Sequence, residues 1–201
     1  MRSTLRRPSI AIATALLSLP MVAAQAQITT FTAFLSGAAE APPNSSPGTG
    51  TGIVTLDQAL NTMRVQVTFF GLTSPVSAAH IHCCLAVPFT GTAGVATVTP
   101  SFTNFPNTTS GWYDFTYNML DAGSYNPAFV TANGGVAGAY ATLTAGLLTP
   151  GRTYLNLHSL PNFPGGEIRG FLQVVPEPST YVLMVSGLAV LGVVARKRRR
   201  T

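Results

Sequence analysis

The chain contains three histidines, and all of them lie in two short segments with the alternating pattern of β-strands. His80 and His82 are two positions apart, and His158 lies two positions after Asn156. Side chains at positions i and i+2 of a strand point to the same face of a sheet. If both segments are extended, His80 and His82 therefore share one face, and Asn156 and His158 do the same.

These histidines could bind one metal ion if the two segments are neighbours in the sheet. Three neutral imidazoles with an open coordination position suit Zn²⁺ or Cu²⁺. The candidate ligands are His80, His82 and His158, and the candidate cofactors are Zn and Cu. Two other uses stay open: a structural cluster in which the histidines hydrogen-bond loop backbone or Glu167, and redox catalysis.

Glu167 and Arg169 are also two positions apart, so they share a strand face. A pair of opposite charges on a sheet is usually structural. Glu167 could instead accept a hydrogen bond from His158 and orient that ring. Both roles stay open for this pair, and Asn156 has the same two alternatives.

Cys83 and Cys84 directly follow the histidine pair and are the only cysteines. Neighbouring Cα atoms are about 3.8 Å apart across a trans peptide, which is shorter than the usual disulfide separation. Because there is no third cysteine, a disulfide within the chain has to be vicinal. The alternatives are two free thiols and a disulfide between chains.

The formal net charge of +5 comes from the two ends of the chain. Residues 27–174 contain three arginines and five acidic residues, which gives this part a net charge of −2. This distribution argues against nucleic-acid binding. The sequence also has no Gly-x-Ser-x-Gly motif and no phosphate-binding glycine loop. We therefore expect no enzymatic activity.

Residues 1–26 have the organisation of a secretory signal peptide. An N-terminal region with three arginines precedes an apolar run at 10–19, and this run is too short to span a bilayer. Ala24 and Ala26 form an A-x-A cleavage site, so we expect the mature chain to begin at Gln27. The alternative is an uncleaved N-terminal anchor.

Residues 175–201 form a different kind of segment. Pro176, Glu177 and Pro178 precede 17 uncharged residues at 179–195, which as a helix would be roughly 26 Å long and could span a membrane. Five basic residues follow and would stay on the cytoplasmic side. This order resembles the PEP-CTERM sorting signal, which implies recognition by a sorting protease of the exosortase type. A plain C-terminal anchor is the alternative.

Between these two segments, residues 27–174 have short alternating runs separated by turn residues, which indicates a mostly β domain. Asn126 followed by proline, with Gly134 and Gly135 further on, predicts a short helix at 127–132, and 136–147 allows another. We expect a single β-sandwich, either Ig-like or similar to the copper–zinc superoxide dismutases. The expected strands are 30–35, 52–56, 62–70, 78–83, 95–99, 112–119, 154–158 and 167–173.

Four motifs in order resemble the CHRD domain, and the similarity extends over residues 30–173. They are Gly71-Leu72, Ala79-His80-Ile81-His82, Tyr154 to His158, and Phe163 to Gly170. The resemblance implies a β-rich module with no established enzymatic activity.

Taken together, these patterns predict an exported, envelope-anchored or exosortase-sorted protein that is delivered to the cell surface or released. Its role would be that of a non-enzymatic structural or binding module. We expect the membrane, the sorting protease, and extracellular polysaccharide or surface proteins as its partners. The alternative is a periplasmic or extracellular Cu- or Zn-binding protein, which could be redox-active.

Overall fold

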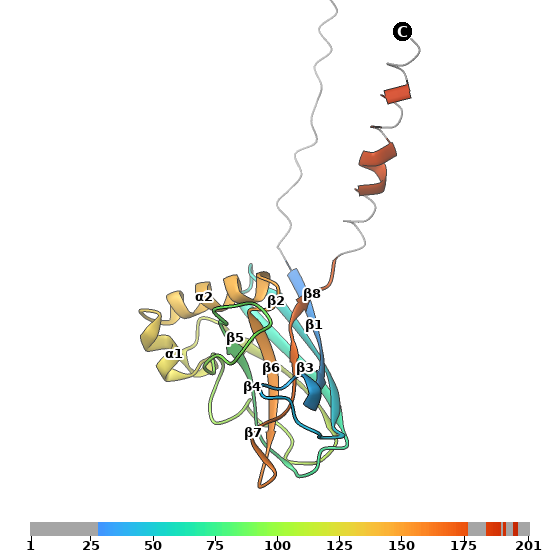
Figure 1. Ribbon diagram of the computed structural model, residues 1–201. Helices are drawn as coiled ribbons and strands as arrows, with labels where there is room; N and C mark the ends of the chain where they lie inside the picture. The colour runs from blue at the N-terminus through green and yellow to red at the C-terminus, as the bar shows by residue number, and fades with distance from the viewer. Residues whose placement is uncertain (1–27, 177–183, 190, 192–194, 197–201) are drawn as a thin grey trace, which may run out of the picture.

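The computed structural model describes residues 28–176, 184–189, 191, 195 and 196 (Figure 1). Within residues 28–176 the chain forms eight strands and two short α-helices. The strands are β1 (Ile28–Ser36), β2 (Thr49–Asp57), β3 (Thr62–Phe70), β4 (Val76–Cys83), β5 (Gly111–Asn118), β6 (Thr153–Ser159), β7 (Phe163–Phe171) and β8 (Gln173–Val174). The helices are α1 (Pro127–Ala132) and α2 (Val136–Leu148), with 3-10 turns at Gly37–Ala39 and Ala122–Ser124.

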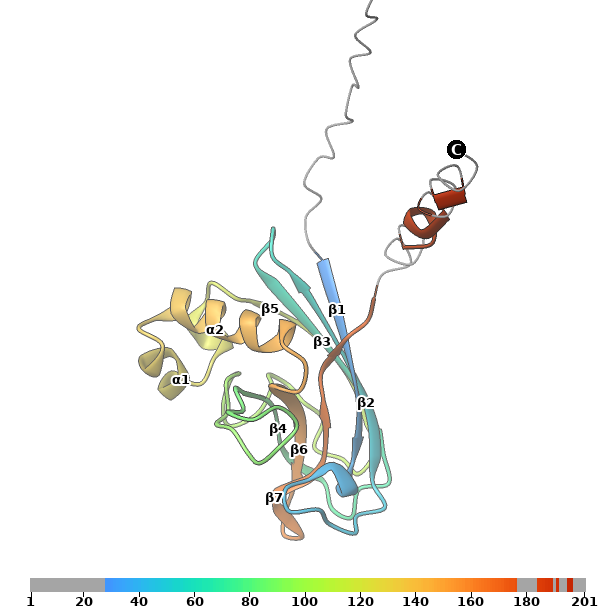
Figure 2. The ribbon, with the colours of Figure 1, turned by 45° about the horizontal axis from the view of Figure 1, so that its top comes forward.

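The mostly β prediction is confirmed, but the strands belong to one continuous antiparallel sheet and not to two separate sheets. The strand order is β4-β6-β7-β1-β2-β3-β5, and β8 pairs with β1. Strand β1 joins the two parts of the sheet, because it pairs with β2 along its length and with β7 at Ser36. Figure 2 shows the resulting curl, which brings β4 and β6 opposite β2 and β3.

The hydrophobic core fills the space inside this curl. On β3 the inward residues alternate with exposed or half-buried ones, as its sequence pattern predicts. A Cβ atom added to Gly52 on β2 would overlap the side chain of Leu155 on β6, so the two halves are in direct contact. The core residues of β3, β4, β6 and β7 are Met63, Val65, Val67, Phe69, Ala79, Ile81, Leu155, Leu157 and Ile168.

Both predicted helices are present. The Asn126 side chain accepts a hydrogen bond from the backbone N–H of Ala128 and caps α1. Helix α2 buries Ala139, Leu143 and Leu147 against one end of the sheet. Figure 2 shows α2 lying across that end.

Two segments differ most from the sequence-based prediction. Residues 95–99 form only isolated bridges, with His82 and Tyr125 as partners. This segment runs along the free edge of β4 as part of the long loop between β4 and β5. The expected loop before Glu167 is instead the first part of β7. Pro164 is tolerated there because it lies near the start of a strand, where a missing N–H costs little.

Several predictions for the two ends fall outside the described residues. These are the signal peptide with Ala24 and Ala26, the sorting residues Glu177 and Pro178, and most of the expected span at 179–195. Among the residues that the structure describes, no helix is both long and apolar enough to cross a membrane.

Candidate metal centre

The two histidine segments are neighbouring strands. Strands β4 and β6 pair antiparallel, with Ala78 opposite His158, His80 opposite Asn156 and His82 opposite Tyr154. All these side chains lie on the face of the sheet that points away from the core. The ring centroid of His80 lies 5.6 Å from that of His82 and 5.1 Å from that of His158. The pairing therefore gathers the three histidines into one cluster.

Loops cover this cluster, and each histidine donates one hydrogen bond to a backbone carbonyl, two of them in the loops and one at the start of β7. His80 Nε2 lies 2.6 Å from Pro100 O, and His82 Nδ1 lies 2.8 Å from Ala93 O. His158 Nδ1 lies 2.9 Å from Pro164 O. A carbonyl oxygen accepts hydrogen bonds only, so each of these nitrogens must carry the proton. In a neutral ring the other nitrogen then presents a lone pair.

The three remaining ring nitrogens have no hydrogen-bond partner among the described residues. They are His80 Nδ1, His82 Nε2 and His158 Nε2, and all three are buried. The ligand nitrogens of these residues lie within 4.8 Å of one another. Zinc–nitrogen bonds are about 2.0–2.1 Å long, so the rings would have to move closer together around a bound ion.

Burial keeps all three imidazoles neutral at pH 7. It lowers the pKa of His80 and of His82 to about 4, although the hydrogen bonds to Pro100 O and Ala93 O act in the opposite direction. It also lowers the pKa of His158. Repulsion between the rings adds to the effect on His80 and His82. Metal ions bind the neutral form of histidine, so the cluster is prepared for binding without prior loss of protons.

A purely structural role for the cluster accounts for only three of the six ring nitrogens, namely those bonded to backbone carbonyls. The bonds to backbone carbonyls are the contacts that a structural role requires. The same role would leave three buried acceptors unpaired, and each would cost about 1–3 kcal/mol. A metal ion between the rings would satisfy all three at once, and the carbonyls would then orient its ligands.

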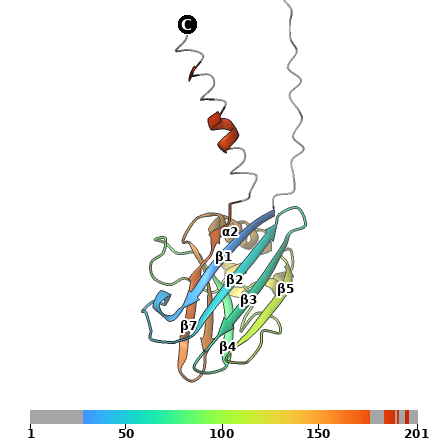
Figure 3. The same cartoon turned by 90° about the vertical axis from the view of Figure 1, so that its right-hand side faces the viewer.

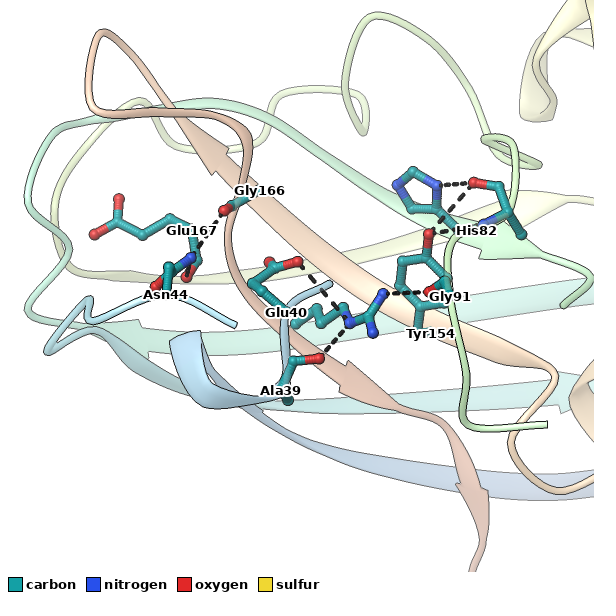
Figure 4. Close-up of polar contacts among 10 residues, drawn as sticks. Ala39, Glu40, Asn44, His82, Gly91, Tyr154, Gly166 and Glu167 are labelled. Atoms are coloured by element: carbon teal, nitrogen blue, oxygen red, sulfur yellow. Dashed lines mark hydrogen bonds and ion pairs between the residues drawn. The ribbon is translucent and has the colours of Figure 1, made fainter. Parts of the chain in front are cut away.

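A column of stacked side chains supports the cluster from one side, and the sequence analysis did not identify it. The Tyr154 ring stacks on His82 with centroids 4.6 Å apart, and the Arg169 guanidinium lies over Tyr154 at 4.8 Å from the ring centroid. Arg169 donates hydrogen bonds to Ala39 O and Gly91 O. These two bonds tie the covering loop at Gly91 and the turn at Ala39 to β7, and Figure 4 shows Ala39 and Gly91 near Tyr154. The sequence signal that could have identified Tyr154 is its position on β6, four residues before His158 and therefore on the same face of the strand.

The predicted partners of Glu167 and Arg169 need correction. Glu167 does not contact His158; it accepts hydrogen bonds from the Ser46 and Ser159 hydroxyls and from the backbone N–H of Thr73. Its role is therefore to hold loops against β7.

Arg169 also pairs differently from the prediction. Its ion-pair partner is Glu40, with Nε 3.9 Å from Oε2, and both side chains are buried. Asn156 lies between His80 and Arg169 in register, and its Oδ1 is buried without a hydrogen-bond partner among the described residues.

The two cysteines lie apart from the histidine cluster. Cys83 and Cys84 form a vicinal disulfide. Both sulfurs lie against Gly146 of α2, because a Cβ atom added there would be 2.6 Å from each of them. The disulfide therefore packs on the helix and supplies no ligand to the cluster.

The pKa values predict how stability depends on pH in the absence of metal. The pKa values of His80 and His82 rise from about 4 in the folded protein to about 6.5 on unfolding, and the pKa of His158 also rises. The unfolded chain therefore binds more protons between pH 4 and 6.5. Stability should therefore fall as the pH drops from 6.5 towards 4. Glu40 opposes this trend, because burial raises its pKa to about 7 in the folded state. The stability lost through the three histidines exceeds the stability gained through one carboxyl, so the free energy of unfolding falls as the pH drops.

Urea unfolding at pH 7.0, 5.5 and 4.5 measures this dependence. The His82→Gln variant lacks one of the titrating rings and should lose less stability over the same range. A wild-type stability that stays constant or rises between pH 6.5 and 4.5 would contradict the buried neutral histidines.

Comparison with known proteins gives two matches to family models. A CHRD domain matches residues 31–172, and a PEP-CTERM protein-sorting motif matches residues 174–200. The search of curated proteins and the search of solved structures found no match. All three histidines lie within the first matched region, which covers most of the chain. The protein therefore belongs to the CHRD domain family and carries a C-terminal PEP-CTERM sorting motif.

Proposed function

We propose that this CHRD-domain protein binds one copper or zinc ion through His80, His82 and His158 at the cell surface. The PEP-CTERM motif implies export, recognition by an exosortase and membrane-anchored localisation at the surface. The observation that carries the proposal is the convergence of three buried, unpaired imidazole nitrogens. We propose a binding role and no enzymatic activity, because the sequence has no recognisable pair of a catalytic nucleophile and a general base.

The ligand set supports copper or zinc over other ions. Imidazole suits Zn and Cu, whereas Mg²⁺ and Ca²⁺ prefer oxygen ligands. Each ring is oriented by a hydrogen bond from its other nitrogen to a backbone carbonyl, which is the usual arrangement around metal-bound histidine. These features support preorganised binding, in which the ion replaces no existing hydrogen bond.

Thermal unfolding with and without metal tests this proposal. An ion that binds only the folded state adds about 2.7 kcal/mol when its free concentration is 100 times the Kd, which corresponds to a rise of several degrees in Tm. We expect Zn²⁺ or copper to raise the Tm of the wild type, and a chelator to reverse the rise. Mg²⁺ should have no effect.

Three variants complete the test. His82→Ala and His158→Ala should lose the metal-dependent rise. Gln66→Ala, on β3 at the far side of the molecule, should keep it. A wild-type Tm that does not respond to Zn²⁺, copper or chelator would refute the metal site.

Extracellular polysaccharide is the partner that we propose for the surface role, and the outer face of the sheet supports it. Phe34, Thr51, Thr68 and Trp112 form one row across β1, β2, β3 and β5. Figure 3 shows these four strands side by side. Strands are about 4.8 Å apart, so roughly 14 Å separate the two ring-bearing positions at the ends of the row.

The chemistry of this row fits a neutral sugar chain. Phe34 and Trp112 are 77% and 74% exposed, and Phe70 borders the same row. A hollow of about 320 Å³ lies between Phe34 and Phe70 and is lined by threonines. Aromatic rings offer apolar contact for the C–H face of a sugar, and threonine hydroxyls offer hydrogen bonds to its edge.

Affinity electrophoresis in gels that contain soluble neutral polysaccharides tests this partner. We expect the wild type to be retarded by at least one of a β-glucan, an α-glucan and the host's own extracellular polysaccharide. Trp112→Ala and Phe34→Ala should remove the retardation, whereas the His82→Ala variant should be retarded as much as the wild type. Unretarded migration of the wild type in all three gels would exclude this role for the face.

A further inference from the structure

We propose that the three-histidine site selects Cu⁺ over Cu²⁺ and Zn²⁺. This inference rests on the proposed metal site and specifies which ion it takes. Imidazole is a ligand for all three ions, so selection has to come from the surroundings of the rings. Three features of these surroundings favour the monovalent ion: the burial of neutral ligands, a nearby buried cation, and the number of available ligands.

The first feature is that the ligands bring no negative charge into a buried place. His80 and His82 are only 6% and 8% exposed, and each ring donates one hydrogen bond to a backbone carbonyl while its other nitrogen has no partner among the described residues. A bound ion therefore keeps its full charge. The cost of burying an ion increases with the square of its charge, so a divalent ion costs about four times as much as a monovalent one. No carboxylate belongs to the ligand group that the described residues form.

The second feature is the positive charge of Arg169 behind Tyr154. Its guanidinium is 4.8 Å from the Tyr154 ring, which stacks directly on His82. Arginine keeps its charge in proteins, so Arg169 repels a bound ion in proportion to the charge of that ion.

The acidic groups near Arg169 offset this charge only in part. Glu40 is the carboxyl that pairs with Arg169, but burial raises its pKa to about 7, so this carboxyl is partly protonated near neutral pH. Glu167 is held by Ser46, Ser159 and the backbone of Thr73. The repulsion between Arg169 and a divalent ion therefore persists at neutral pH.

The third feature is the number of ligands. The cluster supplies three nitrogens, and no further His, Cys, Asp or Glu joins them among the described residues. With three protein nitrogens, Zn²⁺ needs a water as its fourth ligand, and Cu²⁺ prefers tetragonal geometry, so both divalent ions need ligands beyond those that the cluster supplies. Asn156 Oδ1, beside His80 in register, is an amide oxygen, a ligand type that suits hard ions better than copper. Three nitrogens are enough for Cu⁺, which has a filled d shell and accepts trigonal coordination.

Competition titrations of the metal-free protein test this selection. Cu⁺ is titrated without oxygen against the chromogenic chelator bicinchoninate, and Cu²⁺ and Zn²⁺ are titrated against a chromogenic competitor for divalent ions. We expect a Kd for Cu⁺ at least 100-fold lower than for Cu²⁺. By linkage, this ratio raises the reduction potential of the bound copper by about 118 mV above that of the free couple.

The outcomes separate this inference from the function on which it rests. If Zn²⁺ or Cu²⁺ binds as tightly as Cu⁺, the selection is refuted but the metal site stands. If none of the three ions binds, both are refuted. If Cu⁺ binds most tightly and X-ray absorption shows three nitrogen neighbours, both are supported.

Variants of Arg169 test the electrostatic cause. Arg169→Lys keeps the positive charge and should keep the ratio of the Cu²⁺ and Cu⁺ dissociation constants. Arg169→Met removes the charge and should lower this ratio by about tenfold, with a matching fall in the reduction potential. Gln66→Ala, on the outer face of β3 and without a contact to the cluster, serves as the control. Equal potentials in folded Arg169→Met and Arg169→Lys would overturn this cause, and if Arg169→Met does not fold, the wild-type ratio decides the selection.

Discussion

The register between β4 and β6 is the constraint on which the rest of the site depends. It places Ala79 opposite Leu157 and Ile81 opposite Leu155, and all four side chains are fully buried in the core. A shift of one residue would exchange the two faces and bring the histidines into the core. The packing of the core therefore fixes the positions of the three imidazoles on the opposite face. The residues that set the strand register are the same ones that place the histidines.

The covering loops complete what the register begins. The carbonyls of Ala93, Pro100 and Pro164 each take one imidazole proton, which sets the tautomer and turns the remaining nitrogens toward one another. Leaving three acceptors unpaired in a buried place is unfavourable for the protein alone. Such a local cost is expected where a site serves function, and the large core beneath it supplies the stability that offsets it.

Strand alternation predicted much of this arrangement. The period of two residues identified β3 and the two histidine strands, and it placed His80 with His82 and Asn156 with His158. It could not predict long-range pairing, so the partner of Arg169 was missed: Glu40 lies 129 positions earlier in a loop. The single sheet was missed for the same reason, because the alternation within β1 does not reveal that its end also pairs with β7. The carbonyls of Ala93 and Pro100 lie in irregular segments without a sequence period, and that of Pro164 lies in a part of β7 that was expected to be a loop.

The most direct test of the central claim is the protonation state of the three rings in the metal-free protein. Nitrogen-15 NMR of ¹⁵N-histidine-labelled protein at pH 7 distinguishes protonated from unprotonated ring nitrogens. We predict three neutral rings, with the proton on Nε2 of His80 and on Nδ1 of His82 and His158. A cationic ring, or the opposite tautomer at any of the three, would contradict the convergence of lone pairs on one metal site.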